Sequence, residues 1–160
     1  MNMRWIAILA PAVVLAGLPG THAQAPAATP PAPGITGLAH VAFRVSNLDR
    51  EVDFLGKLGF EEAFASIRGT TAVEVFIKVN DRQFIEVYPQ GNPSQPLGWM
   101  HACYESDNLD GLEPLYASRG LNPSKVVKAG AGNLISSLKD PEGRVTEFTQ
   151  YTPDSRHTMD

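Results

Sequence analysis

The stretch that decides the fold is residues 37–62, which read GLAHVAFRVSNLDREVDFLGKLGFEE. The alternation of apolar and other residues over 38–45 is typical of a strand with one buried face. A helix follows, since Ser46 or Asn47 can cap its start and an apolar residue then recurs every three or four positions. Gly59 is expected to end this helix in a left-handed conformation. The stretch therefore predicts a strand followed directly by a helix.

The same pattern returns later in the chain. Residues 98–120 read GWMHACYESDNLDGLEPLYASRG and match the opening stretch, without gaps, at an offset of 61 positions (98 − 37). The register also aligns His40 with His101 and Glu86 with Glu147. The other identities are Gly37 with Gly98, Asn47-Leu48-Asp49 with Asn108-Leu109-Asp110, Gly59 with Gly120, Gly69 with Gly130, and Lys78 with Lys139. We interpret this as a duplicated module of about 55 residues.

Each module is predicted to run strand, helix and then three strands. The predicted strands are 38–45, 64–67, 70–79 and 83–88 in the first module, and 99–105, 126–127, 134–138 and 145–151 in the second. Pro114 falls in the second helix, where it should kink the helix or delay its start. The fold class is therefore α+β, with two βαβββ modules.

The residues before the modules carry the features of an export signal. Residues 1–23 are predicted to be a signal peptide, because Arg4 precedes an apolar run and Thr21-His22-Ala23 places small residues at a cleavage site. An uncleaved membrane anchor is the alternative, but the apolar run is short for a bilayer span. We expect an exported protein, periplasmic or secreted, with no membrane contact after cleavage.

The domain boundaries follow from composition and periodicity. The Pro- and Ala-rich residues 24–34 predict an extended linker. The domain is predicted over 35–151, with modules 35–91 and 98–151, and the polar, aperiodic residues 152–160 are predicted to be a tail.

Composition excludes several classes of protein. The chain has 160 residues, of which 43% are hydrophobic, and 13 Lys and Arg stand against 17 Asp and Glu. This mildly acidic balance lacks the excess of positive charge that binds nucleic-acid phosphates, so we expect no nucleic acid as a partner. Cys103 is the only cysteine, which excludes a disulfide-rich scaffold.

The residues matched by the repeat predict a metal site. His40 and Glu86 lie on the first and last strands of their module, as do His101 and Glu147 of theirs. If the modules pair face to face, the four side chains can converge. Two imidazoles and two carboxylates suit one divalent ion such as Zn, Ni, Co, Mn or Fe. The alternative is that each of the four is an ordinary structural or solvated residue.

The chain has one cysteine and two further histidines, which are also of types that can bind metal. Cys103 is predicted to share the face of His101, and we interpret it as a small buried hydrophobic residue in preference to a thiolate ligand. His157 has no repeat partner and His22 belongs to the signal peptide, so both are set aside.

These residues carry a family resemblance. Residues 37–62 and the closing motif LKDPEGRVTEF at 138–148 resemble the vicinal-oxygen-chelate superfamily, which includes glyoxalase I, the extradiol dioxygenases and the bleomycin-resistance proteins. The resemblance covers about residues 35–151 and implies two βαβββ modules curved into a half-open barrel around one metal ion. It implies that His40, His101 and Glu147 bind the metal, that Glu86 is the fourth ligand found in glyoxalase I, and that Arg44 holds an anionic part of the substrate.

The leading function is a glyoxalase I-like lyase or isomerase. Metal-ligating oxygens of a small substrate would develop enediolate character as a carboxylate removes the neighbouring proton. Glu147 is preferred as this catalytic base and Glu86 is the alternative. Besides Arg44, the predicted substrate contacts are Phe84, Tyr88 and Trp99, which would form apolar walls.

Two other function classes stay open. An extradiol-type dioxygenase would use iron on His40, His101 and Glu147. A resistance-type binding protein would bind a small molecule without catalysis. The two modules could pair within one chain or swap between two chains, and we expect a homodimer.

Overall fold

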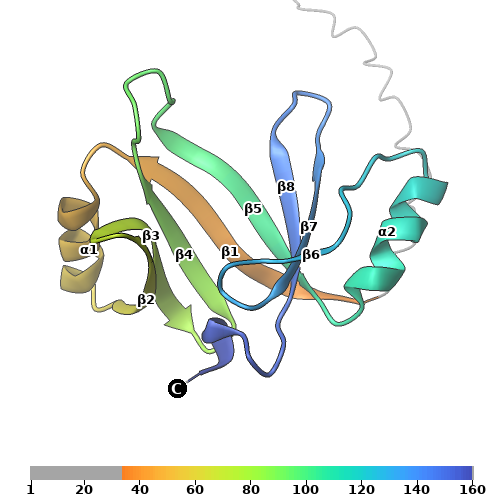
Figure 1. Cartoon of the computed structure of the whole chain (residues 1–160), viewed down its shortest axis with the longest axis horizontal. Helices are drawn as coiled ribbons and strands as arrows, with labels where there is room; N and C mark the ends of the chain where they lie inside the picture. Colours follow the sequence, from red (N-terminus) through yellow and green to blue (C-terminus); the bar gives the residue numbers. More distant parts are fainter. Residues whose placement is uncertain (1–33, 160) are drawn as a thin grey trace, which may run out of the picture. The chain divides into compact units, whose positions relative to one another are not determined.

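The computed structural model describes residues 34–159, which contain two successive βαβββ modules (Figure 1). The first consists of β1 (Ile35–Val45), α1 (Leu48–Lys57), β2 (Glu61–Arg68), β3 (Thr71–Asn80) and β4 (Gln83–Pro89). The second consists of β5 (Gly98–Ser106), α2 (Leu109–Ser118), β6 (Val127–Lys128), β7 (Leu134–Lys139) and β8 (Val145–Gln150), followed by the 3-10 helix η1 (Arg156–Thr158). The predicted fold class is confirmed.

The predicted signal peptide, 1–23, lies outside the described residues, as does the predicted linker except for Gly34. Among residues 34–159, no helix is long and apolar enough to cross a membrane.

One mixed sheet joins the two modules. Its strand order is β2-β3-β4-β1-β5-β8-β7-β6. In each module the first and last strands pair in parallel, and an antiparallel pairing of β1 with β5 joins the modules at the centre. The sheet curls into a half-barrel, with α1 and α2 against the outer face of its two halves (Figure 1). The first and last strands of both modules are therefore neighbours at the floor of the half-barrel.

The helix starts follow the capping residues expected from the sequence. Asn47 Oδ1 accepts a hydrogen bond from the Arg50 amide at 2.9 Å, and Asn108 Oδ1 accepts one from the Gly111 amide at 3.1 Å. Each side chain satisfies an amide that the first helical turn leaves unpaired. Gly59, just beyond α1, has a φ of 95°, as the left-handed helix end predicted there requires.

Pro114 does not delay the start of α2. The helix begins at Leu109, and the Leu112 amide donates to the Asn108 carbonyl at 3.3 Å. The capped first turn forms before the proline is reached, and Pro114 has no amide hydrogen to donate to the Asp110 carbonyl.

Two hydrophobic clusters hold the helices to the outer face of the sheet. They are Leu55, Val75, Ile77 and Val87 under α1, and Leu109, Leu112 and Phe148 under α2. Burying each of these large side chains contributes about 1.5–3 kcal/mol to folding. Since strand residues alternate between faces, the neighbours of the β3 and β4 core residues point to the inner face of the half-barrel.

The residues after β8 pack against the inner side of the sheet. We call Thr152–Met159 the closing segment. It contains η1, and its Arg156 amide donates a hydrogen bond of 2.8 Å to the Ala131 carbonyl. His157 within it is buried, with 7% of its surface exposed. The residues expected to form a polar tail are thus part of the folded unit, because their polar groups make tertiary hydrogen bonds that leave no periodic pattern in the sequence.

Candidate metal centre

Four side chains of the inner face converge where the two modules meet. Residue pairing places His40 opposite Cys103, and Cys103 opposite Glu147. Glu86 and His101 lie one step further along the sheet, on either side of Ala42. We call His40, Glu86, His101 and Glu147 the four-residue cluster.

The atoms that would bind a metal are close together. His40 Nε2 lies 3.2 Å from His101 Nε2 and 3.3 Å from Glu86 Oε2. His101 Nε2 lies 3.2 Å from Glu86 Oε2 and 3.3 Å from Glu147 Oε2, while His40 Nε2 is 3.9 Å from Glu147 Oε2. Ligands bound to one tetrahedral ion by bonds of about 2.1 Å are separated by about 3.4 Å. The donor atoms therefore have the spacing of a mononuclear site.

An unpartnered atom supports the same interpretation. Glu86 Oε2 is buried and has no hydrogen-bond partner among the described residues, although it lies within 3.3 Å of both imidazole nitrogens. A buried carboxylate oxygen without a partner is destabilising unless a cation or proton satisfies it. The cluster fits a divalent ion, which the neutral imidazoles would bind through nitrogen and the carboxylates through oxygen.

The histidines are held in the neutral form that a metal requires. Burial, together with the smaller effects of the neighbouring His101 and His157, lowers the pKa of His40 to about 3. Burial also lowers the pKa of His101, although Glu147 opposes this effect. Both imidazoles are therefore unprotonated near neutral pH and have a nitrogen lone pair to offer.

The carboxyl groups differ in accessibility and in their neighbours. Burial, followed by interactions with Glu74, raises the pKa of Glu86 to about 10 in the absence of a cation. Burial also raises the pKa of Glu147. The Glu147 side chain is 25% exposed, whereas that of Glu86 is 5% exposed. Glu147 is thus the carboxylate that a molecule entering the half-barrel can reach.

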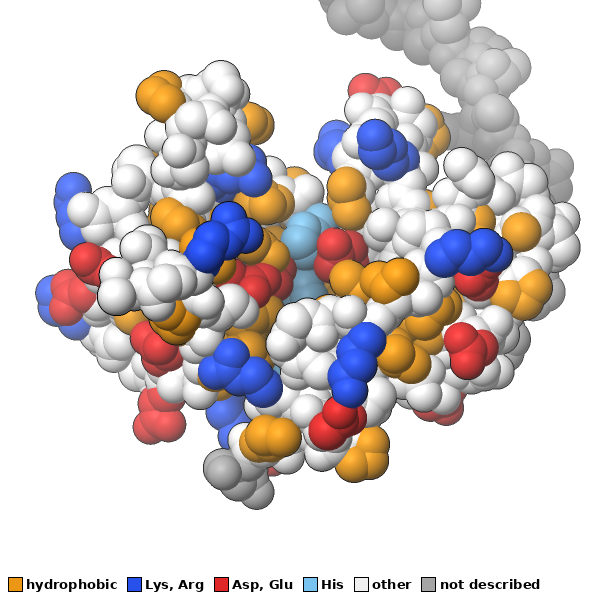
Figure 2. Space-filling view, in the orientation of Figure 1, with side chains coloured by type: hydrophobic (Ala, Val, Ile, Leu, Met, Phe, Trp, Pro, Cys, Tyr) orange, Lys and Arg blue, Asp and Glu red, His pale blue; other side chains and the backbone are white. Residues whose placement is uncertain are grey.

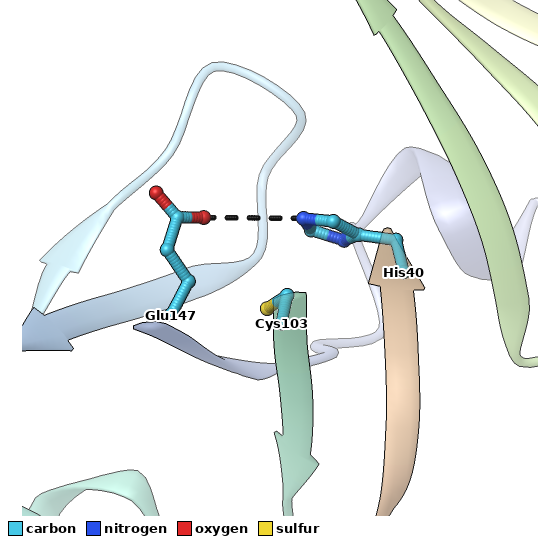
Figure 3. A group of neighbouring side chains, drawn as sticks. All are labelled: His40, Cys103 and Glu147. Carbon is cyan, nitrogen blue, oxygen red and sulfur yellow. Dashed lines mark ion pairs between the residues drawn. The ribbon is translucent and has the colours of Figure 1, made fainter. Parts of the chain in front are cut away.

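Cys103 lies on the floor beneath the cluster. His40 and Glu147 point toward each other across β5, and the Cys103 side chain lies between them (Figure 3). The ligand atoms of these three residues lie within 4.8 Å of one another. Cys103 is fully buried, and burial raises the pKa of its thiol well above its ordinary value. This environment favours the protonated thiol and agrees with its interpretation as a small buried side chain.

Arg44 and Tyr88 lie beside the cluster. They are opposite each other on β1 and β4, one step beyond the Ala42–Glu86 pair. Arg44 donates a hydrogen bond of 3.3 Å to the Pro96 carbonyl, and the Tyr88 hydroxyl donates one of 2.5 Å to Glu74. Arg44 shares the inner face with His40, so it can face an anionic group there.

The structure places Phe84 and Trp99 differently from each other. Phe84 is opposite His40 and is buried among other aromatic rings of the inner face. In β5, the pairing with β1 skips Met100, so a bulge interrupts the alternation between Trp99 and His101. Trp99 is 53% exposed and makes an edge contact with Phe43 at 5.7 Å. The bulge therefore places Trp99 beside Phe43 on the face opposite His101, away from the cluster whose apolar wall it was predicted to form.

Two polar residues of the inner face were not predicted from the sequence. Glu74 accepts hydrogen bonds from Ser66 at 2.7 Å and from Tyr88, and it lies next to Glu86. Burial would raise the pKa of Glu74, but hydrogen bonds from Glu86, Tyr88 and Ser66 outweigh this and lower it. An acidic residue between two valines in β3 was the available signal. The other is His157, which has no repeat partner to point to it.

The cluster is open to solvent on one side. In the space-filling view, histidine side chains lie at the bottom of a central hollow with acidic side chains beside them (Figure 2). Lysine and arginine side chains lie around the hollow. Since both modules of one chain supply the cluster, the described residues complete it without a second copy.

Comparison with known proteins gives a result at the level of structure. No protein-family model matches the sequence, and no curated protein matches it. Methylmalonyl-CoA epimerase from Mycobacterium tuberculosis superposes with a TM-score of 0.65 at 19% identity, over 82% of this chain and 97% of that chain. A Streptomyces coelicolor methylmalonyl-CoA epimerase variant in complex with 2-nitronate-propionyl-CoA gives 0.63 at 18% identity, over 74% and 99% of the two chains.

The chain has the vicinal-oxygen-chelate fold. Hypothetical protein BH1468 from Bacillus halodurans C-125 is a further match, with a TM-score of 0.60 at 15% identity over 72% of this chain and 94% of that one. The fold implied by the sequence resemblance is thereby confirmed. The four-residue cluster lies at the centre of the half-barrel that defines this vicinal-oxygen-chelate fold.

Proposed function

We propose that this protein is a divalent-metal-dependent lyase or isomerase of glyoxalase I type. It would move a proton at a carbon next to a carbonyl group in a small oxygenated substrate. The observation that carries the proposal is the convergence of two imidazoles and two carboxylates within 3.2–3.9 Å, one of each from either module.

The metal and the chain have separate tasks in this reaction. A bound divalent ion, held by His40, Glu86, His101 and Glu147, would stabilise the negative charge that develops on the substrate oxygens. The Glu147 carboxylate would give up its place at the ion to accept the proton, because its side chain is the more exposed of the two carboxylates. Arg44 would bind an anionic part of the substrate, with Tyr88 beside it.

Structural relatives support a proton-transfer reaction. The epimerases named above share the fold, and epimerisation at such a carbon also requires a proton to leave and return. They favour an isomerase-type reaction for this chain over the dioxygenase alternative.

A substitution of Glu86 distinguishes the proposed lyase or isomerase from the dioxygenase alternative. If Glu86 is a ligand, Glu86→Gln replaces a charged donor with a neutral amide, and both metal affinity and turnover of an α-hydroxycarbonyl substrate should fall at least about 100-fold. Glu147→Gln should be equally damaging and is the positive control. Metal content after dialysis and turnover are measured for both variants.

The opposite outcome is equally informative. If Glu86→Gln keeps full metal content and loses about 10-fold or less in rate, Glu86 only supports the site. The three-ligand set of His40, His101 and Glu147 would then be favoured, and with it the iron-dependent dioxygenase. Ligand binding that is unchanged by a chelator in the wild-type protein would point to a non-catalytic binding protein.

We also propose that the protein acts outside the cytoplasm, on the basis of the predicted signal peptide. Expression of the full chain in a bacterial host should yield an exported protein whose first residue is Gln24. Mass spectrometry of the purified protein identifies that residue, and an intact N-terminus on cytoplasmic material would contradict the proposal.

A further inference from the structure

His157 of the closing segment is enclosed by aromatic rings. The ring centroids of Phe64, Phe76, Phe84 and Tyr151 lie 4.9, 4.9, 5.1 and 4.8 Å from the centroid of His157. The three phenylalanines meet the imidazole edge to face, and Tyr151 stacks on it. We call these four rings the aromatic box. It is an apolar compartment of the inner face whose contents are a single side chain.

The aromatic box adjoins the four-residue cluster. Phe76 is opposite Glu86 in the sheet, and Phe84 is opposite His40. The ring of Phe76 also contacts that of His40 edge to face, at a centroid separation of 6.3 Å. A group attached to a molecule held at the cluster and directed toward the first module therefore meets the aromatic box and the imidazole inside it.

The closing segment is anchored to both modules. The Arg156 side chain donates a hydrogen bond of 2.9 Å to the Ala65 carbonyl on β2 and lies over the Phe64 ring at 4.4 Å. Its backbone amide donates to Ala131 in the second module. These contacts, spanning the half-barrel, fix the segment as a wall of the inner cavity.

The imidazole uses only one of its two nitrogens. His157 Nδ1 is 3.1 Å from the buried Ser155 hydroxyl, whereas Nε2 is buried with no hydrogen-bond partner among residues 34–159. Burial lowers the pKa of His157 to about 4, so the ring is neutral near neutral pH. A neutral, flat ring packed by four aromatic rings fills the box chiefly by its shape.

We propose that His157 is a specificity-determining residue, which fills the aromatic box beside the four-residue cluster and thereby limits the group that a substrate can carry on that side. This inference rests on the proposed function, because it assumes that substrate oxygens are held at the cluster. A substrate that fits has at most a few atoms directed toward the first module, and any bulky part extends past Arg44.

Removing the imidazole should open a usable space. A cavity of about 240 Å³ is already lined by His157 and Phe84, together with Lys78, Arg82 and Arg156. His157→Ala would connect the aromatic box with this cavity. The part of this space that the aromatic box lines is apolar, and an aromatic guest there would restore the ring contacts that the box loses with the imidazole.

The test compares two bidentate oxygen ligands of different size. Acetohydroxamate carries a methyl group and benzohydroxamate a phenyl group, and both chelate divalent metals through adjacent oxygens. Their dissociation constants are measured by calorimetry on zinc-loaded wild type, His157→Ala and His157→Phe. His157→Val, which leaves part of the box filled, is made in parallel so that the test does not depend on the folding of His157→Ala.

We expect the alanine variant to favour benzohydroxamate over acetohydroxamate at least tenfold more than the wild type does. The preference of the valine variant for benzohydroxamate should lie between those of the wild type and the alanine variant. The phenylalanine variant should have the preference of the wild type. An unchanged ratio in both small variants, with acetohydroxamate still bound, would overturn the inference and leave the proposed function standing. Failure of zinc-loaded wild type to bind acetohydroxamate would overturn the proposed function, and this inference with it.

Discussion

At the scale of single residues, the cluster depends on each side chain supplying an uncharged nitrogen or an ionised oxygen. His40 and His101 are kept neutral mainly by burial. Glu86 is buried so deeply that its pKa of about 10 keeps a proton on it at neutral pH unless a cation replaces that proton. The same burial that makes the empty cluster unfavourable makes it selective for a positive ion.

The first prediction concerns a single nitrogen donor. His101→Ala removes one of the two imidazoles and leaves Glu86 and Glu147 facing each other, so metal affinity should fall at least about 100-fold. Metal content after equilibrium dialysis is the measurement, by mass spectrometry of the elements. His157→Phe, which changes a histidine outside the cluster, should keep wild-type content. A fully metallated His101→Ala protein would contradict the ligand assignment.

The second prediction concerns protons released on metal binding. Since the pKa of Glu86 is raised to about 10 and that of His40 is lowered to about 3, near neutral pH the carboxyl group carries a proton and the imidazole does not. Metal binding should therefore release at least about one proton, and affinity should rise about tenfold per pH unit between pH 7 and 9. Calorimetry in two buffers of different ionisation enthalpy counts the protons. Glu86→Gln should release about one fewer, and an equal count in both proteins would refute the assignment of the proton to Glu86.

At the scale of elements, the closing segment is held by a loop that requires a glycine. Gly132, between β6 and β7, has a φ of 91°, and a Cβ there would lie 2.6 Å from the Asp154 carbonyl oxygen. The left-handed conformation and the close approach of the Asp154 backbone both exclude a side chain at this position. The loop and the closing segment are thus fitted to each other.

The third prediction uses this fit. Gly132→Ala should lower the free energy of unfolding by about 1–3 kcal/mol, because the new methyl group forces the closing segment away from the sheet. Gly130→Ala is the matched control, since a Cβ there meets no atom within 4 Å and its φ is not in the left-handed range. Denaturant titration of both variants gives the comparison. Equal stability of the two would show that the segment is not tightly docked.

At the scale of the whole molecule, metal binding and folding are coupled. The cluster exists only when β1, β4, β5 and β8 are neighbours, so an ion binds the folded state and not the unfolded chain. In the metal-free protein, the raised pKa of Glu86 opposes its ionisation, so its contribution to stability is lost as pH rises from about 4.5 toward 10. The lowered pKa of His40 acts in the other direction, and its contribution is lost as pH falls below about 6.5 toward 3.

The fourth prediction follows from this coupling. Metal loading should stabilise the protein by about 2.7 kcal/mol at a free ion concentration 100 times the dissociation constant. At a fixed metal concentration this stabilisation should grow between pH 6 and pH 9, because the dissociation constant falls as the proton on Glu86 becomes easier to displace. Melting temperatures with metal and with chelator measure this difference, and Glu147→Gln should show a smaller one. A difference that shrinks with rising pH would contradict the coupling between Glu86 ionisation and metal binding.

Assembly also belongs to this scale. The homodimer expected from the sequence stays a prediction, to be checked by sedimentation of the metal-loaded protein. Because the cluster is complete within one chain, a monomer should bind metal as well as a dimer does. A strictly monomeric, fully metallated protein would refute the homodimer without affecting the metal site.

The local architecture of this protein could be predicted from its amino-acid sequence. The repeat linking His40 with His101 and Glu86 with Glu147 predicted two modules, and the caps at Asn47 and Asn108 predicted where the helices begin. The helix caps can be predicted because they depend only on residues close together in the sequence. The modules can be predicted because the duplication repeats the same local pattern 61 positions later. The four residues named as ligands could be paired from the repeat alone, since a pseudo-twofold relates equivalent positions.

Features that depend on contacts between distant segments could be found in the three-dimensional structure alone. Antiparallel pairing of β1 with β5 brought both modules together within one chain, which the length of the connection left open. A bulge at Met100 turned Trp99 away from His101, because one extra residue reverses the alternation of a strand. His157 lies in the aromatic box although its segment is polar and aperiodic. The hydrogen bonds and ring contacts that hold the segment come from both modules, and such contacts leave no periodic pattern in the sequence.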